Sequence, residues 1–301
     1  MGGNAVVVVN YGSAELVEEN LGPLSAVRSD LRVVVVDSFS SDDEQRRVAQ
    51  LGVDRGWTTV LLPENAGFGG GVNRGVEAAL EAGASAVLVV NPDARLDAAD
   101  AAALLAAALE GDARDVVAPV IRRPDGTLWS AGTDLYLDDG SMAGVRHRAV
   151  HAGRPREFWV SGACFAISAD LWRLVGGLDE AYFLYWEDVD FTWRVRAAGG
   201  RVRILDTASA VHDEGGTHDD QTAGRAKSET FYYYNIRNRM LFAQRWLDEA
   251  TARRWRRTAL RTSWGILLQG GRRQLITSVA PWRALIRGLR DGRRGITGPR
   301  A

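Results

Sequence analysis

The sequence predicts a doubly wound α/β fold, because it opens with two buried strands joined by a helix and then continues to alternate strands with helices. Residues 5–10 and 32–37 are continuous β-branched runs that each end on a polar residue, which is typical of buried parallel strands. Between them, Ser13 is expected to cap a helix whose apolar residues recur at helical spacing. Together these segments predict a βαβ unit.

The same alternation predicts the elements that follow. We expect a strand at 58–62, a glycine-rich loop, a helix near 71–83, a strand at 86–90 and a helix at 98–110. In open sheets of this class, ligands collect beyond the carboxyl ends of the strands. Asn10, Asp37 and Asp93 each follow a different strand, so we expect them to meet in one crevice, although strand-end capping would explain each residue alone.

Beyond residue 111 the pattern is less regular. We expect short antiparallel strands with turns at 124–126 and 138–140, helices at 168–175 and 188–198 that end at paired glycines, and a largely helical region from 227 onward.

Composition bounds the class of protein. The chain has 301 residues, of which 46% are hydrophobic, so it can bury one large core or two modest ones. We expect a cytoplasmic protein, because the sequence shows no signal-type segment and no run of about 18 apolar residues. The single cysteine, Cys164, has no thiol partner, and buried packing is its expected role.

Charge is distributed unevenly along the chain. Residues 251–301 contain 13 arginines and one acidic residue, Asp291, so this tail carries +12 and the remainder −13. Such a tail favours an anionic membrane, a lipid phosphate or another acidic partner over nucleic acid. Two structures explain the tail equally well: an amphipathic helix that lies on a membrane, or a solvated basic helix that packs on the rest of the chain. The apolar residues of this helix would be Trp255, Leu260, Trp264, Leu267 and Leu268.

Three segments could carry chemistry but are ambiguous alone. Residues 65–75 are rich in glycine and precede a helix, but their spacing matches neither a Walker loop nor the dinucleotide fingerprint. The oxygen-rich tip at 91–93 could hold Mg²⁺ or Mn²⁺ against two phosphates, or could be a simple turn. A lone histidine such as His212 is more often structural than a ligand.

Aromatic and acidic side chains are densest between residues 177 and 190. Glu187 and Asp188 stand at the start of an expected helix, where helix capping is the simplest explanation. The surrounding aromatic residues could raise the pKa of one carboxyl group toward the range of a general base, and Trp186 could offer a flat face to a sugar.

Taken in order, these segments resemble family 2 glycosyltransferases of the inverting type, particularly the bacterial rhamnosyltransferase-like branch. The resemblance spans residues 5–240, and its matching pieces are 8–11, Asp37 with 40–42, 65–75, 91–93, 161–163, 187–188 and His212. It implies a GT-A type nucleotide-sugar-binding domain with a mixed sheet at 1–226, divided into a nucleotide-binding half (1–111) and an acceptor-binding half (112–226). A helical, arginine-rich extension would occupy 227–301.

The resemblance also implies roles for single residues. The nucleotide-sugar would contact Asn10, Tyr11, Asp37, Asn65, Gly67, Asn73, Asn91, Asp93, Gly162 and Ala163. Asp93 would bind Mg²⁺ or Mn²⁺, with His212 as a second ligand. Asp188 would be the catalytic base with Glu187 as its partner, and Trp186 would face the acceptor.

Three positions depart from the family pattern. Ser38 stands where asparagine is usual and Gly12 where a larger polar residue is common, which blurs the choice of nucleobase. Asn91 replaces the first aspartate of the family's Asp-x-Asp motif and lowers the negative charge of the metal site.

The implied reaction is a single displacement that inverts the sugar, with Asp188 taking the acceptor proton and the metal stabilising the departing diphosphate. The donor would be a dTDP- or UDP-sugar, with dTDP-L-rhamnose favoured, and the acceptor a saccharide, lipid-linked or a natural product. A homo-oligomer is left open.

Two alternatives belong to other classes. A non-catalytic nucleotide-sugar-binding module could dispense with Asp188, and a sugar nucleotidyltransferase would need a basic glycine-rich loop near its N-terminus. Residues 8–20 contain no basic residue, and the carboxylate pair at 187–188 is intact.

Overall fold

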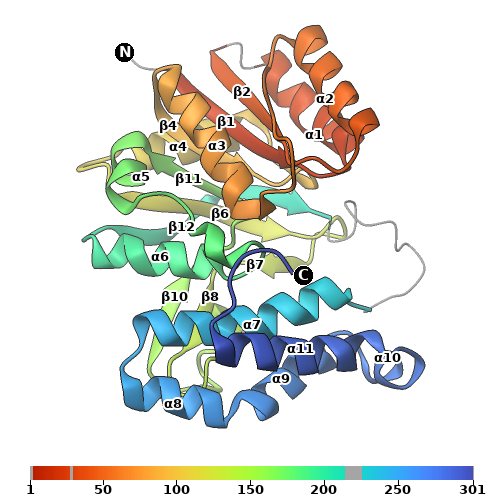
Figure 1. Ribbon diagram of the computed structural model, residues 1–301. Coiled ribbons are helices and arrows are strands. Elements are labelled where there is room, and N and C mark those ends of the chain that lie inside the picture. The colour runs from red at the N-terminus through yellow and green to blue at the C-terminus, as the bar shows by residue number, and fades with distance from the viewer. Residues whose placement is uncertain (1–2, 28–29, 214–225, 301) are drawn as a thin grey trace.

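The computed structural model describes residues 3–27, 30–213 and 226–300, and its centre is a mixed sheet (Figure 1). The sheet has nine strands in the order β3-β2-β1-β4-β11-β6-β12-β5, with β7 paired to β6. The strands are β1 (Gly3–Asn10), β2 (Leu31–Asp37), β3 (Thr58–Leu61), β4 (Ala84–Val90), β5 (Ala94–Arg95), β6 (Asp115–Arg122), β7 (Leu128–Ser130), β11 (Cys164–Ser168) and β12 (Arg201–His212).

Strand direction decides which loops share an edge of the sheet. β3, β2, β1 and β4 run parallel to one another, so their polar carboxyl ends lie together. β11 runs antiparallel to both β4 and β6. The residues just before β11 therefore lie at the edge where β4 ends, which brings residues 161–163 next to Asn91.

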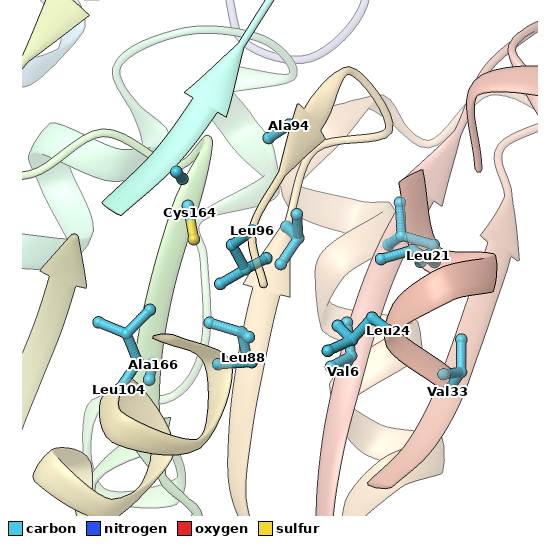
Figure 2. Close-up of a cluster of buried hydrophobic side chains, with 14 of the residues drawn as sticks. Val6, Leu21, Leu24, Val33, Leu88, Ala94, Leu96, Leu104, Cys164 and Ala166 are labelled. Atoms are coloured by element: carbon cyan, nitrogen blue, oxygen red, sulfur yellow. The ribbon is translucent and has the colours of Figure 1, made fainter. Parts of the chain in front are cut away.

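Helices cover both faces of the sheet, as a doubly wound fold requires. One face is covered by α1 (Ala14–Val27), α2 (Asp42–Arg55) and α4 (Ala98–Ala108), and the other by α3 (Gly67–Glu81), α5 (Ala169–Val175) and α6 (Glu187–Ala197). Figure 2 shows Leu21 and Leu24 of α1 over Val6 and Val33 of the sheet. Cys164 lies in the same core, fully buried, and burial raises the pKa of its thiol to about 12, so its expected packing role is confirmed.

The glycine-rich segment is helical, which corrects the expectation of a loop before residue 71. α3 begins at Gly67, and its glycines permit close approach to the sheet. A Cβ on Gly71 would lie 2.6 Å from Val9 Cγ1, and a Cβ on Gly75 would lie 2.4 Å from Val7 Cγ1. These two glycines are explained by the contact between α3 and β1, without a ligand.

The start of α1 also differs from the expectation. The Ser13 hydroxyl donates to the Tyr11 carbonyl rather than capping the helix. The amide of Ala14 instead donates to the carboxylate of Glu44, 2.7 Å away on α2. A distant side chain therefore satisfies an amide at this helix terminus, which local sequence could not reveal.

A second, three-stranded sheet and the C-terminal helices complete the molecule. The sheet pairs β10 (Arg156–Trp159), β8 (Thr133–Tyr136) and β9 (Met142–Gly144), with the expected turn at 138–140 joining β8 to β9, and the turn at 124–126 joins β6 to β7. Short 3₁₀ turns occur at η1 (Val145–His147) and η2 (Glu180–Tyr182), and the extension consists of α7 (Glu229–Trp246), α8 (Glu249–Arg257), α9 (Ala259–Leu268), α10 (Arg272–Thr277) and α11 (Ala280–Arg294).

The extension shares a core with the segments before it. Leu135, Trp186 and Val189 pack with Phe242 of α7 and Trp255 of α8 in one hydrophobic cluster. In Figure 1 the helices α7 to α11 gather at the end of the molecule opposite β1 and β2. None of the helices in the described ranges is long and apolar enough to cross a bilayer.

Candidate active site

One end of the site is built where β1 and β2 finish side by side. Asn10 and Asp37 are register partners, and the amide nitrogen of Asn10 donates to Asp37 Oδ1 at 2.8 Å and to Glu44 Oε1 at 3.1 Å. Burial raises the pKa of Asp37, although the Asn10 hydrogen bond opposes that shift. Tyr11 follows with a ring that is 49% exposed. Glu44, which sequence analysis missed, fixes the orientation of the Asn10 amide.

The loop after β3 is tied to the same edge. Asn65 Oδ1 accepts from the amide of Gly67 at 2.8 Å and from the hydroxyl of Ser38 at 3.3 Å. The Ser38 hydroxyl also accepts from the amide of Ala66. Ser38, a departure from the family pattern, therefore fastens this loop to the end of β2.

Asn73 and Gly67 both contact the loop that leads to α6. Asn73 Oδ1 accepts from the amide of Leu178 at 2.8 Å, and its nitrogen donates to the Leu178 carbonyl and to Glu180 Oε1. A Cβ on Gly67 would lie 2.2 Å from the Phe183 carbonyl oxygen. These contacts account for both residues without a ligand, and their role in a nucleotide pocket stays a prediction.

Asp93 and His212 meet at the far edge of the sheet. His212 of β12 pairs with Ala94 of β5, and this register brings His212 Nε2 to 3.0 Å from Asp93 Oδ1. Both residues are buried, and their two atoms are in contact but not aligned for a hydrogen bond. Within the described ranges, His212 Nδ1 and Asn91 Oδ1 also make no hydrogen bond. The ring of His212 is further fixed by an edge contact with Trp129 at 4.7 Å.

Buried oxygen and nitrogen atoms without hydrogen bonds are suited to a divalent cation. The described residues contain no group of three or more histidine, cysteine or acidic side chains that could hold a metal ion. Asp93 and His212 could supply two protein ligands to such an ion, and its remaining ligands would have to come from outside the protein.

Asp188 sits at the first turn of α6 against the segment before β11. Its Oδ2 accepts from the amide of Gly162 at 3.0 Å and its Oδ1 from the amide of Val189 at 2.8 Å. Burial raises the pKa of Asp188 to about 6, although both amides favour the charged form. The Gly162 contact is tertiary, so it is not explained by helix capping.

Glu187 is the more deeply buried member of the pair, only 4% exposed. Burial, and then the neighbouring charge of Asp188, raise the pKa of Glu187 well above its usual value. Its Oε2 makes no hydrogen bond within the described ranges. Of the two carboxyl groups, Asp188 has the amide donors that favour its charged form, whereas burial disfavours the charged form of Glu187.

The loop before this pair has an unusual backbone. Phe183, Tyr185 and Trp186 have φ values of 64°, 62° and 75°, in the left-handed region that non-glycine residues rarely adopt. Such conformations cost about 1–3 kcal/mol each and persist where surrounding contacts impose them. The carboxylate pair thus follows directly on a strained loop.

Helix α7 supplies the contacts that hold this loop. The amide nitrogen of Asn238 lies 3.0, 2.8 and 2.7 Å from the carbonyl oxygens of Tyr182, Leu184 and Tyr185. Arg237 donates to the Tyr182 carbonyl as well, at 2.7 Å. Asn238 and Arg237 are fully buried. Neither residue was expected at the site from the sequence, where the available signal was a group of polar residues among the aromatic and aliphatic residues of α7.

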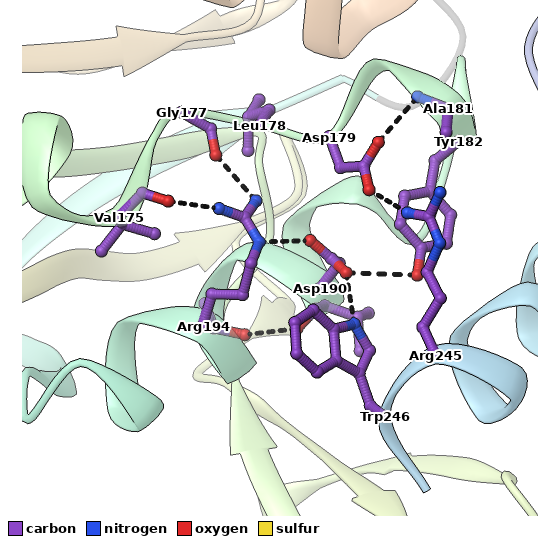
Figure 3. Close-up of polar contacts among 12 residues, drawn as sticks. Val175, Gly177, Leu178, Asp179, Ala181, Tyr182, Asp190, Arg194, Arg245 and Trp246 are labelled. Atoms are coloured by element: carbon purple, nitrogen blue, oxygen red, sulfur yellow. Dashed lines mark hydrogen bonds and ion pairs between the residues drawn. The ribbon is translucent and has the colours of Figure 1, made fainter.

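Asp190 anchors the other side of α6. Figure 3 shows its carboxylate accepting from Arg194 Nε, Trp246 Nε1 and the Tyr182 hydroxyl, at 2.6, 2.6 and 3.2 Å. Arg194 also donates to the carbonyls of Val175 and Gly177. The spacing of Asp190 and Arg194, four residues apart on a helix, was the available sequence signal.

The structure corrects the expected role of Trp186. Its side chain is 4% exposed and packs against Phe242 and Trp255, with ring centroids 5.6 and 6.4 Å away. The indole therefore belongs to the core and offers no face to an acceptor.

Two groups of the predicted site residues lie at the edge of the sheet where β1, β2 and β4 end. The amide of Asn91 donates to the Ala163 carbonyl at 2.8 Å, while the neighbouring Gly162 contacts Asp188. A continuous chain of contacts thus runs from Asp188 through the 162–163 segment to Asn91, next to Asp93 and His212. The nucleoside end, at Asn10 and Asp37, lies at the carboxyl edge of the same sheet.

Comparison with known proteins identifies the family. The glycosyl transferase family 2 model matches residues 5–172, more than half of the chain. N-acetylglucosaminyl-diphospho-decaprenol L-rhamnosyltransferase of Mycobacterium tuberculosis is 29% identical over 246 residues, covering 73% of this chain and 77% of the relative. The low-salt glycan biosynthesis hexosyltransferase Agl10 of Haloferax volcanii is 26% identical over 248 residues, covering 79% of this chain and 74% of the relative.

Solved structures share the fold. Mannosyltransferase PcManGT from Pyrobaculum calidifontis, in complex with GDP-Man and Mn²⁺, aligns with a TM-score of 0.56 at 18% identity, covering 97% of this chain and 87% of that one. S. aureus TarS in complex with UDP-GlcNAc aligns with a TM-score of 0.55 at 19% identity, covering 98% of this chain and 81% of that one. GalNAc-T7 with UDP, GalNAc and Mn²⁺ aligns with a TM-score of 0.58 at 14% identity, covering 83% of this chain and 49% of that longer chain.

The sheet, the helices on both its faces and these structural likenesses define an α/β GT-A fold with a C-terminal helical extension. The family match and the rhamnosyltransferase and hexosyltransferase relatives agree with it: the chain belongs to glycosyl transferase family 2, and within that family it is rhamnosyltransferase-like.

Proposed function

We propose that this glycosyltransferase is an inverting enzyme in which Asp188 is the general base. The observation that carries the proposal is the Asp188 carboxyl group, held by the amides of Gly162 and Val189 and with a pKa raised to about 6 by burial. Such a group is ionised at pH 7 but still has appreciable affinity for a proton, as a general base requires.

The proposed step is a single displacement. Asp188 takes the proton of the acceptor hydroxyl as the acceptor oxygen forms a bond to the anomeric carbon. The bond between that carbon and the diphosphate breaks at the same time, and the diphosphate leaves with the electron pair. Burial raises the pKa of Glu187, which disfavours a second negative charge beside Asp188. No nucleophile from the protein is needed, and the configuration inverts.

Asp93 and His212 are the proposed metal ligands, with Asn91 beside them. The buried atoms of these residues without hydrogen bonds support the assignment. A bound Mg²⁺ or Mn²⁺ would neutralise charge on the departing diphosphate. Mn²⁺ is the ion named with two of the similar structures.

In the same proposal, residues 1–111 bind the nucleotide and residues 112–226 the acceptor. The nucleoside contacts are Asn10, Tyr11 and Asp37. Asn65, Gly67 and Asn73 line the nucleotide pocket, and Gly162 with Ala163 flanks the donor sugar. We infer a dTDP- or UDP-sugar, with L-rhamnose favoured by the mycobacterial relative.

A lipid-linked saccharide is the proposed acceptor, because the name of that relative specifies a decaprenol diphosphate. The chain would then work at the inner face of a membrane, in peripheral contact through its C-terminal tail. A soluble natural-product acceptor is the competing outcome.

The experiment is a donor screen with UDP-, dTDP- and GDP-sugars and Mg²⁺ or Mn²⁺, comparing wild type with Asp188→Asn and Asp170→Asn. Asp170 is a matched control, since it also lies in the first turn of a helix but is exposed and paired with Arg173. We expect turnover to fall by about a thousandfold or more in Asp188→Asn alone, with donor binding retained.

Three outcomes would count against the proposal. An active Asp188→Asn variant would remove Asp188 as base, and retention of the donor's anomeric configuration in the product would exclude the single displacement. Donor binding by wild type without any turnover would favour a non-catalytic binding module.

A further inference from the structure

The outer side of the last three helices exposes a continuous apolar surface. On α9, Leu260, Trp264 and Leu268 recur every fourth residue and are 60%, 43% and 36% exposed. On α11, Trp282 and Ile286 are 39% and 68% exposed. The rings of Trp264 and Trp282 lie 5.8 Å apart, so the two stripes join. We call this surface, together with Ile276 and Val279, the outer face.

The inner sides of the same helices are packed against the rest of the molecule, so the outer face is a separate apolar surface. Trp255 and Leu267 are fully buried, so for these two of the five apolar residues the packed helix holds and the membrane-lying helix does not. On α11, Cβ atoms at Gly288 and Gly292 would lie 3.0 Å from Ile236 and from the Met240 sulfur, so α11 sits close against α7. The outer face is therefore a second apolar side on tightly packed helices.

Charge indicates what covers this face. Residues 251–301 contain 13 arginines, and their one acidic residue, Asp291, is 7% exposed and bound by Arg290 and Tyr233. A second copy of this chain docked through the same face would bring two strongly cationic surfaces together, which is costly. A polyanionic partner that accepts apolar side chains fits both properties.

We propose that the outer face of α9, α10 and α11 docks on an anionic lipid bilayer. Trp264 and Trp282 are suited to the headgroup level, where amphipathic rings gather, and the apolar residues between them enter the acyl boundary. The exposed arginines at Arg257, Arg261, Arg272 and Arg273 contact lipid phosphates. This deepens the proposed lipid-linked acceptor by naming the docking surface, and it can be tested without the transfer reaction.

The test is flotation of the full-length protein with vesicles of phosphatidylcholine alone or with phosphatidylglycerol, in the absence of sugar nucleotide. The variant is Trp264→Ser with Ile286→Ser, which removes two exposed apolar side chains. The control is Val53→Ser with Val150→Ser, at positions 78% and 79% exposed outside the extension. Unfolding curves of all three proteins are recorded beside the flotation. Val53, Val150 and Ile286 are largely exposed, and Trp264 loses one ring contact with Trp282, so the variant should remain folded with a modest loss of stability.

We expect wild type and control to float with the anionic vesicles and the variant to bind about tenfold more weakly or worse. Tryptophan fluorescence of wild type should be quenched by vesicles containing brominated lipid, and less so in the variant. Added salt should weaken binding to anionic vesicles.

Unchanged flotation of the variant would overturn the proposal, as would equal binding of wild type to neutral and anionic vesicles. Light scattering that shows a wild-type dimer and a variant monomer, with no flotation of either, would assign the face to a second copy. Failure of these tests would leave the assignment of Asp188 untouched, since no step measures transfer.

Discussion

Asn238 is buried on α7, and its replacement by aspartate probes how the extension supports the catalytic pair. The Asn238 amide nitrogen has two hydrogens, which three carbonyl oxygens of residues 182–185 share. Aspartate has nearly the same volume, so no cavity forms. It turns a donor into an acceptor facing three carbonyls, which removes two hydrogen bonds and leaves buried oxygens without partners.

The expected cost follows from these contacts. Each buried carbonyl left without its donor costs about 1–3 kcal/mol, and the carbonyls of Leu184 and Tyr185 lose theirs. Arg237 offsets part of this, because it still donates to the Tyr182 carbonyl and to the remaining side-chain oxygen at position 238. We therefore expect the free energy of unfolding to fall by about 2–4 kcal/mol.

The Asn238→Asp substitution should also lower kcat in the fully folded protein. The left-handed residues at 183, 185 and 186 relax once their contacts are lost, and a shift of about 1 Å in a catalytic group costs roughly a hundredfold in rate. Asn238→Asp should thus lower kcat about a hundredfold at a temperature where it is fully folded, with a smaller change in the KM for donor.

The assays are urea unfolding followed by circular dichroism and steady-state turnover with the preferred donor. The control is Asn235→Asp on the same helix, where the amide donates only to the Phe231 carbonyl one turn earlier and the side chain is half-buried. If Asn238→Asp matches this control in unfolding free energy and in kcat, the loop is held by other contacts and the reasoning is refuted.

Three further predictions test the base, the metal site and the glycines. Activity should fall about tenfold per pH unit below about 6, because Asp188 becomes protonated. Since burial raises the pKa of Asp188 in the folded state, the free energy of unfolding of wild type should decline as pH rises from about 4 to 6. Asp188→Asn should therefore be more stable than wild type at pH 8 but not at pH 4. Asp93→Asn and His212→Ala should each raise the Mn²⁺ concentration for half-maximal activity about tenfold or more, and equal metal dependence in all three proteins would exclude the site. Gly75→Ala should cost about 1–3 kcal/mol in chemical unfolding, because its Cβ would lie 2.4 Å from Val7 Cγ1, while Gly265→Ala on α9, with open space around it, should be neutral or slightly stabilising.

Much of the fold could be predicted because its signals are local. The β-branched runs at β1, β2 and β4 can only be buried strands, and the spacing of apolar residues sets the helices between them. Polar residues at the ends of parallel strands must share an edge, which is why Asn10 and Asp37 were expected together and lie 2.8 Å apart.

The rest depended on contacts between distant segments. Nothing near Gly67 indicated that its α-carbon lies against the Phe183 carbonyl, and nothing near Ser13 indicated that Glu44 would satisfy the start of α1. Trp186 looked like a binding face because its neighbours are acidic, yet Phe242 and Trp255 cover it.

The sequence by itself determined the strands β1, β2 and β4, most of the helices that alternate with them, the edge where polar residues gather and the position of the acidic pair at 187–188. The tertiary structure decided the direction of β11, the meeting of Asp93 with His212, the hold of Asn238 on the loop before Asp188, and which apolar side of α9 and α11 stays exposed. The local pattern of residues reports only on side chains that are close together along the chain. Burial, and with it the pKa of Asp188, is set by residues that only folding brings near.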